Sequence, residues 1–184
     1  MKKKRNNTKI FLIIISSLLI LFGVYFLILY FSPKLKGFYS KNSNISFSEN
    51  QNYVKISNHN INTLITEGGE EQLDKGAWHR FPDRGNPETG GNFILSAHSF
   101  VWGKTPGEVT EKSFFYSLKD VKEGEEVLVR WNGKDYKYRV EKVFQVKPTQ
   151  TDIEDASGEA KLTIYTCTEK GSADGRVVVI AKPI

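Results

Sequence analysis

An uncharged apolar segment near the N-terminus most constrains how this chain folds. Residues 10–31 contain no acidic or basic side chain. As an α-helix, these 22 residues extend about 33 Å, enough to cross a hydrocarbon core of about 30 Å. A cleaved signal peptide is the alternative, but its apolar region is shorter and ends in small residues. This segment instead ends in Tyr30 and Phe31, followed by Ser32 and Pro33. The sequence therefore predicts a retained transmembrane anchor.

Basic residues are concentrated before this segment. Five of the chain's 26 basic residues lie within residues 1–9, so the other 21 equal the 21 acidic residues in number. Flanking cations favour a cytoplasmic N-terminus, which predicts a single-pass protein of the cell membrane with its remaining residues outside the cell. Because that remainder is formally neutral, the composition argues against a nucleic-acid partner.

The remainder divides into a polar stalk and one domain. Residues 32–52 are rich in Ser, Asn and Lys, which is typical of a linker, and residues 53–184 are predicted to form the domain. Cys167 is the chain's only cysteine, so an intramolecular disulfide is excluded. The three histidines are scattered. The sequence therefore predicts no metal site and no cofactor.

Short β-strands dominate the predicted domain. Residues 126–131 and 134–140 flank the pair Asn132-Gly133, which is a strong signal for a β-hairpin. Residues 93–97 form an apolar run that is typical of a buried strand. Residues 112–118 are expected to form one helical turn that directs its aromatic side chains toward the core. Many short strands with few helices indicate a mainly β protein, either a closed barrel or a sandwich.

Three polar side chains next to predicted strands form a candidate active site. Residues 162–167 are predicted to be a buried strand that ends at Cys167, and residues 93–97 are followed by His98. Arg176 begins a further apolar strand. Each residue alone has a commoner structural role, since a lone cysteine is usually a small buried apolar residue. Together they supply a thiol nucleophile, a base and a fixed cation on the rigid supports that catalysis needs.

Residues 162–167, followed by an arginine nine residues later, resemble the signature of the sortase family. That signature is Thr-Leu-x-Thr-Cys and then Arg, and Ile164 stands at its Leu position. Ala97 precedes His98, where the family usually has glycine. The resemblance extends over residues 53–184. It implies a closed eight-stranded sortase-type β-barrel with short helices, and a membrane-anchored cysteine transpeptidase of the bacterial cell surface.

The resemblance also implies a role for each candidate residue. Cys167 attacks the Thr carbonyl of a Leu-Pro-x-Thr-Gly-like sorting signal on a surface protein, and His98 protonates the departing amine. Arg176 holds the substrate backbone or the oxyanion. The acyl group then passes to an amine of a cell-wall precursor or a pilin. The residues implied to line the substrate groove are Ser96, Val146, Ile153, Tyr165 and Thr166. For Val146, packing in the barrel core is an equally good interpretation.

Two other functions remain open at this stage. In a cell-wall Cys/His peptidase, water accepts the acyl group, but such enzymes commonly place the cysteine before the histidine, at the start of a helix. In a non-catalytic surface domain, Cys167 is simply buried. No second apolar span follows the last predicted strand, which favours general protein anchoring over pilus assembly. His79 is expected to be structural, and Asp152, Glu154 and Asp155 are expected to be solvated rather than bound to calcium.

Overall fold

The structure, a computed structural model, describes residues 2–39, 47–48 and 50–184. Within these ranges, the α-helices are α1 (Lys2–Tyr39) and α2 (Pro106–Lys112). The strands are β1 (Tyr53–Ile56), β2 (Ile61–Thr66), β3 (Ala77–His79), β4 (Gly85–Asn86), β5 (Gly90–Ser96), β6 (Glu126–Trp131), β7 (Lys134–Val146), β8 (Lys161–Thr168) and β9 (Gly171–Pro183). The 3-10 helices are η2 (Ser57–His59), η3 (Glu70–Asp74), η4 (Pro82–Arg84), η5 (Leu118–Asp120) and η6 (Asp152–Glu154).

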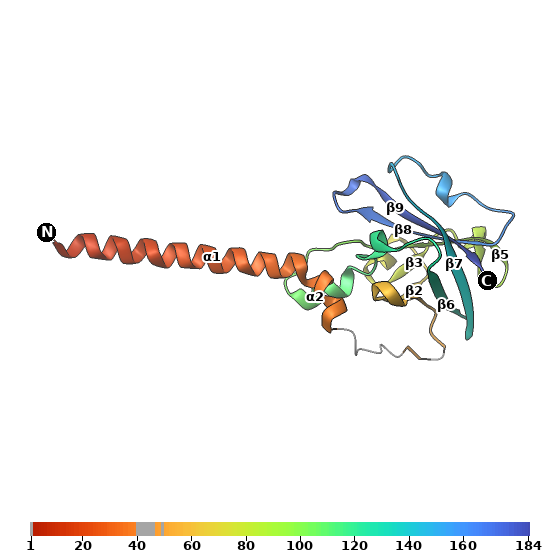
Figure 1. The fold of residues 1–184 in the computed structure, drawn as a ribbon, viewed down its shortest axis with the longest axis horizontal. Helices are drawn as coiled ribbons and strands as arrows, with labels where there is room; N and C mark the ends of the chain where they lie inside the picture. Colours follow the sequence, from red (N-terminus) through yellow and green to blue (C-terminus); the bar gives the residue numbers. More distant parts are fainter. Residues whose placement is uncertain (1, 40–46, 49) are drawn as a thin grey trace.

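The strands close into a barrel (Figure 1). Their order is β3-β2-β1-β6-β7-β9-β8-β5, and the ring closes because β3 pairs with β5 as well as with β2. β4 adds only a short pairing at the outer side of β5. The closed eight-stranded barrel implied by the resemblance is therefore confirmed.

The barrel interior is filled by one apolar core, to which the predicted hairpin contributes. Val127 and Val129 of β6 and Tyr138 of β7 are buried in it. The hairpin itself is confirmed, since β6 and β7 pair up to Trp131 and Lys134. Between the strands, Asn132 and Gly133 have φ values of 48° and 75°, as the tightest hairpin turn requires.

A second, smaller apolar cluster covers the outer face of the barrel beside β8. It contains Ile94, Ile153, Tyr165 and Val178. Ile153 belongs to η6, within a segment between β7 and β8 that passes over this face. β8 is therefore buried on both faces for most of its length, which explains its continuous apolar sequence.

One predicted helix position is wrong. The helical turn expected at residues 112–118 is replaced by α2, which lies one turn and a half earlier and ends at Lys112. Thr105 starts α2, because its Oγ1 accepts a hydrogen bond from the backbone N–H of Glu108 at 3.2 Å. Phe115 is still buried in the core, but in the turns that follow the helix.

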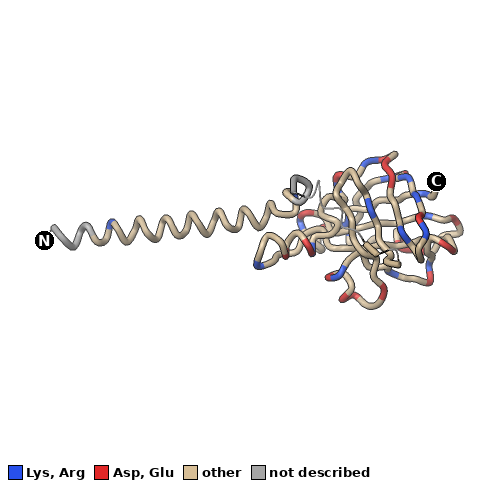
Figure 2. Tube along the Cα trace, turned by 90° about the horizontal axis from the view of Figure 1, so that it is seen from below, with Lys and Arg blue, Asp and Glu red and all other residues tan. Residues whose placement is uncertain are grey.

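α1 projects away from the barrel as a long rod (Figure 1). Residues Asn7–Leu35 are long and apolar enough to cross a membrane. Figure 2 shows this rod almost free of charged residues, in contrast to the barrel. The predicted stalk at residues 32–52 begins as helix, because α1 continues to Tyr39. Residues 40–46 and 49 of that stalk lie outside the described residues.

Candidate active site

A cavity of about 620 Å³ opens beside the ends of β5, β8 and β9. Its volume lies within the range of about 300–1,000 Å³ that is typical of ligand sites. Cys167, His98 and Arg176 all line it. The other lining residues are Glu70, Leu73, Trp78, Arg80, Ser96, Ala97, Ser99, Phe100, Trp102, Tyr165, Thr168, Glu169, Lys170, Gly171 and Ser172.

The alternation of side chains along β8 directs Cys167 away from the barrel interior. Leu162 and Ile164 belong to the interior core, whereas Tyr165 belongs to the outer cluster. Because successive side chains of a strand point to opposite faces, Cys167 shares the outer face with Tyr165. It is the penultimate residue of β8 and is half-buried. The strand therefore presents the thiol at the cavity wall with little freedom to move.

Arg176 lies directly opposite Cys167 on the neighbouring strand β9. Directly opposed residues of an antiparallel pair project from the same face, so the guanidinium and the thiol share one side of the sheet. Nη1 of Arg176 donates hydrogen bonds to the carbonyl oxygens of Ser172 at 2.7 Å and Gly175 at 3.0 Å. These bonds fix the cation against the backbone of its own strand.

The strand that carries Arg176 starts earlier than predicted. β9 begins at Gly171, which pairs with Thr168 of β8, so the two strands form a tight hairpin rather than two strands joined by a loop. The pairing then shifts between Thr168 and Cys167, which leaves residues 172–175 as a bulge. The bulge places the Ser172 and Gly175 carbonyl groups within reach of the guanidinium.

His98 lies in the loop after β5, two residues beyond the strand end at Ser96. The backbone on both sides of its Cα atom is held by hydrogen bonds. The carbonyl of Ala97 accepts one from the hydroxyl of Thr166 at 2.7 Å, and the carbonyl of His98 accepts one from the N–H of Phe115 at 2.9 Å. Ala97 is not among the described residues with positive φ, so alanine fits here without backbone strain.

The imidazole of His98 approaches the carboxylate of Asp74, at the end of η3. Nε2 lies 3.4 Å from Oδ1, and the two side chains are 32% and 63% exposed. An ion pair as exposed as this contributes about 0–1 kcal/mol. Asp74 was not singled out in the sequence, because only barrel closure brings η3 next to the loop after β5.

The barrel domain also matches a known protein family. The family model described as the sortase domain matches residues 54–184. The chain belongs to the sortase family. Its sortase domain contains all three candidate residues, and its first matched residue, Val54, lies next to the predicted domain boundary at Tyr53.

Individual sortases resemble this chain over most of the barrel. A sortase A of Streptococcus agalactiae is 30% identical over 133 residues, which are 70% of this chain and 51% of the relative. The chain therefore spans about half the length of this curated relative. Among solved structures, a Clostridium perfringens sortase D5 transpeptidase has a TM-score of 0.60 at 23% identity, covering 73% of this chain and 79% of that one. Listeria monocytogenes sortase A has a TM-score of 0.62 at 19% identity, covering 74% and 88%. These structures support the fold.

The five residues implied to line the substrate groove occupy three places in the sortase domain. Ser96 and Tyr165 line the large cavity. Thr166 lines a smaller cavity of about 190 Å³ that also contains Cys167. Val146 and Ile153 pack in the outer apolar cluster, where Ile153 is 7% exposed. A role for each of them in substrate binding remains a prediction.

A polar network that the sequence analysis missed lies under the cavity. Nη1 of Arg80 donates to the hydroxyl of Tyr165 at 2.8 Å and lies 3.1 Å from Oε1 of Glu154. The same hydroxyl donates to Glu154. Burial, and then the neighbouring Glu154 carboxylate, raise the pKa of Tyr165 to about 12. The expectation that Glu154 is solvated is wrong, since the residue is 6% exposed. The described residues contain no group of three or more His, Cys, Asp or Glu side chains arranged to hold a metal ion.

Proposed function

We propose that this chain is a cysteine transpeptidase that joins sorting-signal-bearing surface proteins to an amine. The observation that carries the proposal is that His98, from the loop after β5, lines one cavity of about 620 Å³ together with Cys167 and Arg176 of the β8–β9 hairpin. A nucleophile, a proton carrier and a cation in one cleft are the groups that acyl transfer needs.

In the first step, the thiolate of Cys167 attacks the Thr carbonyl carbon of a Leu-Pro-x-Thr-Gly-like sorting signal. A C–S bond forms, the peptide C–N bond breaks, and His98 gives its proton to the departing Gly amine. The product is a thioester between Cys167 and the surface protein. In the second step, an amine of a cell-wall precursor or a pilin attacks the thioester. His98 takes up the proton that this amine loses, and the thiolate leaves.

Arg176 supplies positive charge where the carbonyl oxygen becomes an oxyanion. Its position opposite Cys167 in the register supports this role, because the nucleophile and the cation then lie on the same face of the sheet. The two backbone bonds made by Nη1 use part of the guanidinium. An arginine carries five N–H donors, so donors at Nε and Nη2 remain for the substrate.

The proposal includes a membrane location. Residues 10–31 of α1 span the bilayer once, residues 1–9 lie in the cytoplasm, and residues 53–184 form the catalytic domain outside the cell. The apolar length of α1 supports the span, and the basic residues before it support the orientation.

Intact-mass spectrometry tests the chemistry. The detergent-solubilised full chain is incubated with a synthetic Leu-Pro-x-Thr-Gly peptide, with and without an added amine such as triglycine. A transpeptidase gains the mass of the acyl fragment and then releases an amine-linked product whose yield depends on the amine. Peptide cleavage that is independent of the amine would instead identify a hydrolase. If a panel of peptides varied at each signal position gives no adduct and no cleavage, the chain is a non-catalytic surface domain.

A further inference from the structure

The C-terminal part of α1 packs against the barrel next to the candidate active site. Leu29 and Ser32 are 4% and 6% exposed, and Pro33 is also buried. The spacing of three and four residues places these side chains on one face of the helix. One turn earlier, the hydroxyl of Tyr25 donates a hydrogen bond to the carbonyl of Lys104. Figure 1 shows this end of α1 beside α2 and the loop that precedes it.

A cluster of aromatic rings forms the rest of this contact. Residues 99–105, which we name the rim loop, place Trp102 against α1. Its ring centroid lies 6.4 Å from that of Phe26 and 6.5 Å from that of Tyr30. Phe100 lies 5.0 Å from Trp102 and 5.9 Å from Tyr30. Despite these neighbours, Trp102 is 58% exposed. Much of this residue therefore faces the medium that surrounds this part of α1.

The length of α1 indicates whether this medium is lipid or water. Tyr30 lies 20 residues after Ile10, where the uncharged segment begins. At 1.5 Å per residue this distance is about 30 Å, the thickness of a hydrocarbon core. The level of Tyr30 is therefore the outer boundary of the bilayer, and Phe26 lies about one helical turn below it. Tryptophan and tyrosine are enriched at this boundary, because their rings are apolar and their N–H or O–H groups are polar.

We propose that the rim loop is a membrane-contacting element that sits in the headgroup region of the phospholipid bilayer. The indole of Trp102 lies among the upper acyl chains, and the exposed side chain of Lys104 extends outward to the lipid phosphates. The inference rests on the proposed function only in that α1 spans a membrane.

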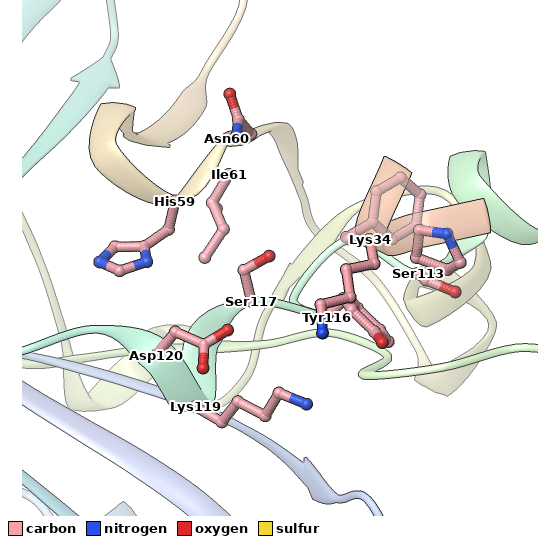
Figure 3. Close-up of a pocket in the computed structure, with 11 residues that line it drawn as sticks. Lys34, His59, Asn60, Ile61, Ser113, Tyr116, Ser117, Lys119 and Asp120 are labelled. Atoms are coloured by element: carbon pink, nitrogen blue, oxygen red, sulfur yellow. The ribbon is translucent and has the colours of Figure 1, made fainter. Parts of the chain in front are cut away.

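The contact has a consequence for the site. Ser99, Phe100 and Trp102 of the rim loop line the same cavity as His98 and Cys167. A rim loop held in the headgroups therefore makes the cavity open directly at the membrane surface, where membrane-tethered substrates are presented. Near the same junction, Lys34 of α1 and Tyr116 line a separate cavity of about 160 Å³ (Figure 3).

Tryptophan quenching by lipids tests the inference in the full chain. The protein is reconstituted into phosphatidylcholine–phosphatidylglycerol vesicles with bromine atoms near the top of the acyl chains. The chain has three tryptophans, so Trp102→Phe is compared with wild type and with the matched control Trp78→Phe. Trp78 also lines the cavity, but on β3, away from α1. We expect brominated lipid to quench wild type and Trp78→Phe, and Trp102→Phe to lose most of that quenching.

Three outcomes would overturn the inference. Lipid quenching that is unchanged in Trp102→Phe means that Trp102 does not reach the acyl chains. Quenching of Trp102 by aqueous iodide to the same extent in vesicles and in detergent means that the rim loop is held in water. Protection from both quenchers means that protein, such as a second copy of the chain, covers it. Extraction of the vesicles with alkaline carbonate separately tests whether α1 spans the membrane. If carbonate extracts the protein, the membrane part of the proposed function fails too. If the protein is retained but Trp102 is not quenched by lipid, only the rim-loop contact is refuted.

Discussion

His79, in β3, and His98, after the paired strand β5, are close in the fold but differ in how their rings are held. His79 is 1% exposed and faces the barrel interior. The ring centroids of Phe93 and Trp131 lie 4.8 Å and 5.4 Å from its imidazole, both in edge-on geometry. Its Nε2 donates a hydrogen bond to the carbonyl of Gly85 at 3.1 Å. Two aromatic neighbours and the Gly85 carbonyl therefore hold this ring in place.

His98 has the opposite arrangement. Its backbone is held by two hydrogen bonds, but its side chain is 32% exposed in a cavity and meets the exposed Asp74 at 3.4 Å. A ring that exchanges protons with substrates needs a fixed Cα atom and accessible nitrogen atoms. The comparison teaches that residue type alone does not distinguish a structural histidine from a reactive one. The difference lies in whether packing holds the ring itself or only the backbone that carries it.

The largest effect is expected at Cys167, the nucleophile with which His98 is proposed to act. Cys167→Ala should abolish acyl-enzyme formation, because no other thiol exists in the chain. The free energy of unfolding should change by less than about 1 kcal/mol, since Cys167 is half-buried at a strand end. Intact-mass spectrometry and chemical denaturation measure the two effects. Any remaining amine-dependent product in this variant would refute the mechanism.

His98→Ala should lower the rate of acyl-enzyme formation by about 10²–10⁴-fold, the usual contribution of a positioned acid–base group. The thermal midpoint should change little, because the side chain extends into the cavity rather than the core. The matched control is His59→Ala, which removes a histidine that pairs with Glu125 and does not line the cavity. Single-turnover kinetics measure the rate of acyl-enzyme formation in both variants. Equal rates would mean that His98 takes no part in proton transfer.

His79→Ala should show the reverse pattern. Removing a buried ring from the core and leaving Gly85 O without its donor should cost about 2–4 kcal/mol of unfolding free energy. Activity per folded molecule should be retained at temperatures below the new midpoint. Urea denaturation and an active-site titration measure these quantities. A folded His79→Ala variant that had lost its activity would break the distinction between the two histidines.

Much of this arrangement follows from local sequence, and some of it does not. The hairpin at Asn132-Gly133 was predictable because the turn residues determine the backbone geometry. Cys167, His98 and Arg176 were found because each adjoins or lies within an apolar strand. Cys167 and Arg176 are close because β8 and β9 form a hairpin. His98 joins them through the pairing of β5 with β8, which no local pattern encodes and which the family resemblance supplied.

The missed features share a physical reason. Asp74 and Glu154 acquire their partners, His98 and Arg80, through contacts between segments far apart in the chain. α2 starts at a single N-cap residue, Thr105. In the sequence, this cap is a weaker indication of a helix than the aromatic residues that follow α2, which is why the helix was predicted too late. The packing of α1 on the rim loop was also outside the prediction, because a long apolar segment accounts for a membrane span without any contact to the domain.

A smaller effect is expected at Tyr165, which lines the same cavity as His98. Its pKa is about 12 against an ordinary value of 10.0, so the folded state holds the phenol proton more tightly than the unfolded state does. This contribution is complete below pH 10 and is lost as the pH rises toward 12. Between pH 10 and 12, the unfolding free energy of Tyr165→Phe should therefore fall by roughly 2 kcal/mol less than that of wild type.

The matched control for this prediction is Tyr138→Phe. Burial also raises the pKa of Tyr138 to about 12, but the residue lies in the interior core, away from the cavity. Denaturation at a series of alkaline pH values should show a similar flattening for both variants, and only Tyr165→Phe should alter the reaction with peptide. An unchanged pH dependence in Tyr165→Phe would show that the hydroxyl is not protected by the fold.

The smallest effect is expected at the one contact through which His98 resembles His79, its carboxylate neighbour. Nδ1 of His79 lies 3.1 Å from Oε1 of Glu67, and Nε2 of His98 lies 3.4 Å from Oδ1 of Asp74. Asp74 is 63% exposed, so an ion pair there contributes at most about 1 kcal/mol, or roughly fivefold in rate. Asp74→Asn should therefore lower the rate by no more than that factor. The substitution keeps the shape of the side chain and removes its charge, so it isolates the electrostatic part of the contact. Single-turnover kinetics measure this rate, and a much larger loss would mean that Asp74 acts on the substrate directly.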